Sequence, residues 1–88
     1  MLGEAHYRRA EKAFRKCIQL EPGRPWPYFN LALALDRSGD DVQAARMYLK
    51  AKELYPPGSK DWADATAAAF DLLKTTICAE EPKPDWWN

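Results

Sequence analysis

Residues 25–58 read PWPYFNLALALDRSGDDVQAARMYLKAKELYPPG, and this stretch decides the fold. Apolar side chains recur at steps of three and four residues over 26–37 and again over 41–54, the spacing that gathers them on one face of an α-helix. Gly39 separates the two stretches, because glycine favours the backbone conformation that ends a helix. Asp40 then supplies a side chain suited to cap the next helix. The segment therefore predicts two helices joined by a tight turn.

The rest of the chain repeats this pattern at a spacing of 34 residues. Residues 34 positions apart are similar in size and chemical type. The matching pairs are Ala10 and Ala44, Phe14 and Tyr48, Cys17 and Ala51, Pro22 and Pro56, and Tyr28 and Trp62. Such a period is typical of arrays of helix pairs, each of which buries its apolar face on a neighbour. The same periodicity predicts further helices over 5–20 and 60–78. We expect an all-α, antiparallel helix–turn–helix fold of about four helices, with an extended tail over 80–88.

The pattern of residues 25–58 resembles the tetratricopeptide repeat (TPR) family. The residues that carry the resemblance are Tyr28, Leu31, Ala32, Leu35, Gly39, Asp40, Ala44, Tyr48, Ala51 and Pro56. Residues 5–22 match only the second half of such a unit, and residues 60–78 match a first helix that runs on as a closing helix. The resemblance therefore implies a solenoid fragment over 1–79 that holds a half unit, a full unit and a closing helix.

The half unit lacks the helix that the resemblance places before it. Its apolar face, which includes Tyr7 and Phe14, is then left uncovered. Exposed apolar patches of this kind mark interfaces. We expect either a piece of a longer protein or a chain that docks onto another subunit, and the remaining alternative is a complete, free, monomeric domain.

The resemblance also implies a concave groove that is lined by the first helices of the units. The residues expected to face it are Trp26, Phe29, Asn30, Leu33, Arg37, Lys60, Ala63, Asp64, Ala67 and Phe70. Trp26, Phe29 and Phe70 are the expected anchors, because large aromatic side chains contribute most at interfaces. Packing of Trp26 and Phe29 in the core is the alternative. We expect no clamp for a C-terminal carboxylate, since Phe29, Leu33 and Asp64 replace polar or basic residues of the clamp found in chaperone-binding members.

Two adjacent tryptophans, Trp86 and Trp87, follow the proline-bearing segment after the last predicted helix. Two indoles left in water expose a large apolar area, which is unfavourable. They suit a docking tail that inserts into a neighbouring subunit. The alternatives are that they fold back on the chain's own helices or remain mobile.

The charge of the 88-residue chain is zero overall but unevenly distributed. Residues 1–24 hold six basic and three acidic side chains, a net charge of +3, and residues 60–88 hold three basic and six acidic ones, a net charge of −3. This polarity can orient head-to-tail stacking or steer a charged partner. The alternative is a pair of ordinary solvated faces, because exposed charges interact weakly in water.

The sequence holds no pattern that indicates catalysis, a cofactor or a metal site. His6 is the single histidine, and neither a phosphate-binding glycine loop nor a zinc-protease motif occurs. Cys17 and Cys78 follow no metal or redox spacing. We interpret them as reduced core thiols of an intracellular, reducing compartment, and no stretch approaches the roughly 20 apolar residues of a transmembrane helix.

These observations favour a non-catalytic protein–protein interaction module, in particular a small scaffold or assembly subunit within a larger complex. A second hypothesis is a free peptide-binding TPR adaptor or co-chaperone. A third is a binder of nucleic acid or lipid driven by the basic residues of the first helix, although no aromatic side chains alternate with them to stack on bases.

Overall fold

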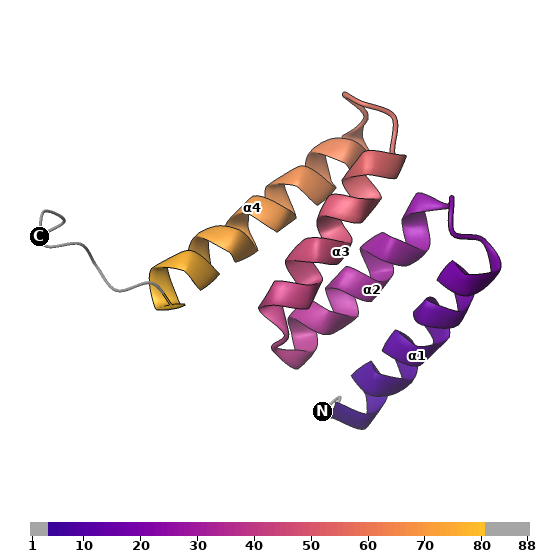
Figure 1. Cartoon of the computed structure of the whole chain (residues 1–88), viewed down its shortest axis with the longest axis horizontal. Coiled ribbons are helices and arrows are strands. Elements are labelled where there is room, and N and C mark those ends of the chain that lie inside the picture. Colours follow the sequence, from indigo (N-terminus) through magenta and orange to yellow (C-terminus); the bar gives the residue numbers. More distant parts are fainter. Residues whose placement is uncertain (1–3, 81–88) are drawn as a thin grey trace, which may run out of the picture.

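The computed structural model describes residues 4–80, with side chains for residues 6–74, and contains four helices. They are α1 (Glu4–Leu20), α2 (Pro25–Ser38), α3 (Asp41–Leu54) and α4 (Lys60–Glu80). Figure 1 shows them side by side in sequence order, with successive helices running in opposite directions. Each helix packs against the one before it. The predicted all-α, antiparallel fold is confirmed for this part of the chain, and the tail with Trp86 and Trp87 lies outside it.

Local signals in the sequence fix where the helices begin and end. At the end of α2, Gly39 adopts a left-handed φ of 94°, and its N–H donates to the carbonyl of Asp36 at 3.1 Å. Asp40 caps α3, because its carboxylate accepts a hydrogen bond of 3.2 Å from the N–H of Gln43. Ser59 caps α4 in the same way and accepts from the N–H of Trp62 at 3.1 Å.

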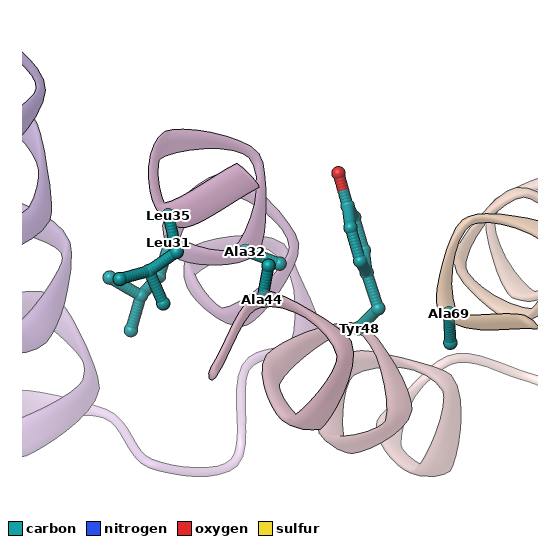
Figure 2. Close-up of a cluster of buried hydrophobic side chains, with 6 residues drawn as sticks. All are labelled: Leu31, Ala32, Leu35, Ala44, Tyr48 and Ala69. Atoms are coloured by element: carbon teal, nitrogen blue, oxygen red, sulfur yellow. The ribbon is translucent and has the colours of Figure 1, made fainter. Parts of the chain in front are cut away.

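The core lies between α2 and α3 and extends to the outer helices. Its main cluster consists of Leu31, Ala32, Leu35, Ala44, Tyr48 and Ala69. Figure 2 shows Ala32 and Ala44 facing each other where α2 meets α3, while Leu31 and Leu35 lie on the side of α2 toward α1. Ala32 and Ala44 are both completely buried. These small side chains let the two backbones approach closely, and larger residues fill the space around them.

The 34-residue spacing of the sequence is also a spacing of the structure. The N–H of Glu21 donates to the carbonyl of Cys17 at 2.9 Å, and the N–H of Tyr55 donates to that of Ala51 at the same distance. The helices α1 and α3 end 34 residues apart, at Leu20 and Leu54. Therefore α1 corresponds to α3, and by the same spacing α4 corresponds to α2.

Residues at the ends of the row of helices are less buried than their pattern predicts. Leu20 is 74% exposed, although the pattern places it on the apolar face of α1. Cys17 is a free thiol that is only partly buried, and in α4 Leu72 and Leu73 are also partly buried. The cause is the same in each case, because among the described residues each outer helix packs extensively against one neighbour, whereas α2 and α3 each pack against two. In α2, by contrast, Ala34 is buried together with Tyr28, Leu31, Ala32 and Leu35.

Candidate functional site

A hollow of about 330 Å³ lies between α1 and α2. From α1 it is lined by His6, Tyr7, Ala10 and Phe14, and from α2 by Asn30, Leu33, Ala34 and Arg37. The centre is apolar, and polar side chains from both helices contribute to the wall. A concave apolar surface with a few polar groups is the usual form of a binding site.

Helical periodicity explains why these side chains converge. Residues three or four positions apart share one face of a helix, and the lining residues of each helix follow that spacing. Leu33 is 37% exposed, so apolar surface in the hollow is open to solvent. Phe14 is only partly buried, and its ring meets that of Trp26 edge to face, with centroids 6.4 Å apart. This contact ties α1 to α2 beside the hollow.

The structure brings together residues that the sequence assigned to two separate surfaces. Tyr7 and Phe14, predicted as an exposed face of the first helix, line the same hollow as three predicted groove residues, Asn30, Leu33 and Arg37. Trp26 lies beside it and is 40% exposed. We therefore treat this hollow as one candidate site that is formed by α1 and α2.

The other predicted groove residues lie elsewhere. Phe29 is partly buried and packs edge to face against Tyr48, with ring centroids 5.2 Å apart, so it belongs to the core packing of α2 on α3. Lys60, Ala67 and Phe70 lie exposed on α4 and do not line the hollow, and Ala63 and Asp64 are likewise exposed on α4. Phe70 is 58% exposed, the largest value for an aromatic residue among the described side chains.

Sequence reasoning missed three lining residues: His6, Ala10 and Ala34. Ala10 matches Ala44 at the 34-residue spacing. Ala44 is completely buried, whereas Ala10 is only partly buried. The available signal was the missing neighbour, since a residue that matches a buried one but lacks a covering helix must line an open surface.

A second hollow, of about 280 Å³, lies where α1, α2 and α3 meet. Its walls include Tyr28 and Leu31, which are core residues, together with Arg15, Ile18, Gln19 and Met47. The hydroxyl of Tyr28 donates to the carbonyl of Pro22 at 2.7 Å and is thereby satisfied. The guanidinium of Arg15 is paired with Glu11 at 3.0 Å. We interpret this hollow as a surface groove over the core.

Two phenols of the described residues have a raised pKa. Burial raises the pKa of Tyr48. The negative charge of Asp36 raises this pKa further, whereas the positive charge of Arg37 lowers it. Burial also raises the pKa of Tyr55, with a smaller contribution from Asp61. Both phenols are therefore neutral at physiological pH. Within residues 4–80, no group of three His, Cys, Asp or Glu residues lies close enough to hold a metal ion.

Comparisons with protein-family models, curated proteins and solved structures find no match for this chain. The TPR resemblance therefore stays a prediction that rests on the residue pattern. None of the described helices is both long enough and apolar enough to cross a membrane.

Proposed function

We propose that this chain is a non-catalytic protein–protein interaction module of the TPR type, which binds a partner helix in the hollow between α1 and α2. The observation that carries the proposal is that α2 fills the corresponding space on α3. Such a module suits a small assembly subunit within a larger complex. The free thiol of Cys17 supports a reducing, intracellular compartment.

The internal repeat shows which contacts a bound helix would make with α1, because α2 already makes the corresponding contacts with α3. At a spacing of 34 residues, Ala10 and Phe14 correspond to Ala44 and Tyr48 of α3. Ala44 is 0% and Tyr48 3% exposed, because α2 covers them. In α1 the corresponding side chains are only partly buried and line the hollow. The hollow therefore lies where a helix equivalent to α2 would pack.

The same comparison defines the chemistry of the partner. On α3, a small residue of α2 meets Ala44 and the ring of Phe29 packs against Tyr48. A partner helix therefore needs a small residue opposite Ala10 and an apolar side chain opposite Phe14. Arg37 at the wall favours a carboxylate on the partner. An amphipathic helix that lays its apolar face into a groove is a common mode of recognition.

A labelled peptide with the sequence of residues 25–38, stapled on its polar face to keep it helical, tests the proposal by fluorescence anisotropy. An isolated helix of this length is marginal in water, which is why the staple is needed. We expect saturable binding to the whole chain. Leu33→Glu places a charge in the hollow, and we expect it to weaken binding by at least roughly tenfold, or about 1.4 kcal/mol.

Val42→Glu is the matched control for Leu33→Glu. Val42 is 42% exposed, close to the 37% of Leu33, but it lies on α3 and does not line the hollow. We expect the Val42 variant to bind like the wild type, and both variants to melt cooperatively within a few degrees of it. Absence of saturable binding, or equal losses in the two variants, would contradict the proposed function.

A further inference from the structure

We propose that the helix that fills the hollow is α4 of a second copy of this chain, so that copies associate head to tail. This inference rests on the proposed function, because it names the occupant of the same hollow. It is carried by the register of the repeat, by exposed residues on both outer helices and by their opposite charge.

The register makes the two outer helices complementary halves of one unit. The helix α1 corresponds to α3, the second helix of the full unit, and α4 corresponds to α2, the first helix. Ala65 and Ala69 of α4 are both 0% exposed. Their counterparts in α2, Leu31 and Leu35, are 0% and 2% exposed. Within the described residues, α1 has no first-helix partner and α4 has no second-helix partner. A head-to-tail pair supplies both.

The contacts of the full unit can be transferred to this pair. Ala32 of α2 faces Ala44 of α3 (Figure 2), and the corresponding residues are Thr66 of one copy and Ala10 of the other. Both are small and only partly buried in the single chain. They therefore permit the close approach of two helices that the full unit already shows.

The pair also covers two of the most exposed apolar side chains. Leu54 packs against the cluster that contains Tyr28, and the corresponding contact joins Leu20 of one copy to Trp62 of the other. Leu20 is 74% exposed in the single chain. Phe70 is 58% exposed in the single chain. It lies one turn beyond Thr66 on the same face of α4, so in this pair it lies along the interface with α1.

The charges of the two helices favour this pairing over the alternatives. The helix α1 has five basic and two acidic residues, a net charge of +3. The helix α4 has two basic and four acidic residues, a net charge of −2. Opposite charges attract when α4 approaches α1, whereas pairing of α1 with α1 brings like charges together. Because this interface is heterologous, each pair keeps a free α1 and a free α4 and can grow into an open chain or a closed ring.

The helix α4 does not turn back into a second helix of its own unit at the position where α2 does. This agrees with a second helix that is supplied by another copy of the chain. In the full unit the chain turns back at Gly39. The corresponding residue in α4 is Leu73, and the helix continues through it to Glu80. A partner helix from a second copy requires no turn at this point.

Light scattering coupled to size exclusion tests the inference on the full chain. We expect the mass of the wild type to rise above the 10.1 kDa of one chain as its concentration increases from roughly 10 µM to roughly 1 mM, the range of weak to moderate affinity. Leu33→Glu disables the hollow and Phe70→Glu disables α4, so each variant alone should stay monomeric. Val42→Glu should associate like the wild type.

The decisive arm mixes the two disabled variants in equal amounts. Leu33→Glu keeps an intact α4 and Phe70→Glu keeps an intact hollow, so the mixture should form a heterodimer of twice the mass of one chain. Tyr7→Glu serves as a second hollow variant should the Leu33 variant melt without cooperativity. A mixture that stays monomeric, or a Phe70 variant that associates as strongly as the wild type, would overturn the inference.

The outcomes separate this inference from the proposed function. A wild type that stays monomeric but binds the peptide of residues 25–38 would refute pairing between copies and leave the helix-binding function standing. A wild type that neither associates nor binds the peptide would refute both.

Discussion

At the scale of single residues, Gly39 is a position where the backbone conformation requires glycine. Its φ of 94° lies in the left-handed region, and a Cβ added there would meet no atom within 4 Å. The cost of Gly39→Ala is therefore conformational rather than steric, and we expect a loss of about 1 kcal/mol in the free energy of unfolding. Urea denaturation monitored by circular dichroism measures it.

Gly23 provides the matched control for this prediction. An added Cβ would also meet nothing within 4 Å there, but φ lies outside the left-handed region. We expect Gly23→Ala to leave the free energy of unfolding unchanged or slightly higher, because alanine restricts the unfolded chain. Equal losses in the two variants would show that the conformation of Gly39 is not the cause.

Tyr48 makes stability depend on pH at the alkaline end. Burial raises the pKa of its phenol above the ordinary value of 10.0, so the folded chain holds this proton more tightly than the unfolded chain does. The resulting stabilisation is complete below pH 10.0 and declines as the pH rises above it. We expect Tyr48→Phe to show a smaller fall in melting temperature between about pH 9 and 11 than the wild type, although Tyr55 retains part of the effect. Parallel curves for the two proteins would contradict this assignment.

At the scale of helices, stability should follow the number of packed neighbours. Among the described residues, helices α2 and α3 each pack extensively against two neighbours, whereas α1 packs extensively against α2 only. Regions with fewer buried contacts open at lower free energy. We expect the backbone amides of α1 to exchange with deuterium faster than those of α2 and α3. If the slowest exchange is found in α1, this helix is stabilised by contacts other than its packing on α2, and the prediction is wrong.

The same scale shows how far the sequence determines the structure. The periodic apolar residues and the Asp40 cap predict the helices to within two residues at each end, because these signals are local. The open face of α2 was harder to predict. Phe29 and Leu33 lie one turn apart, and only the position of α3 decides that Phe29 packs against Tyr48 while Leu33 lines the hollow.

At the scale of the whole molecule, the row of helices has a different surface at each end. One end offers the basic helix α1 and the hollow, and the other offers the acidic helix α4 with Phe70. A chain of 88 residues buries only a modest core. Binding a helix at the α1 end would add buried apolar area and stabilise the fold by mass action.

The measurement that tests the central claim most directly is nuclear magnetic resonance of the isotope-labelled Phe70→Glu chain, which keeps the hollow intact, during titration with the stapled peptide of residues 25–38. We predict that the largest changes in amide chemical shift fall on the lining of the hollow in α1 and α2, at Tyr7, Ala10, Leu33 and Ala34. Saturating changes confined to α3 and α4, or no changes at all, would contradict the claim that the hollow between α1 and α2 is the helix-binding site.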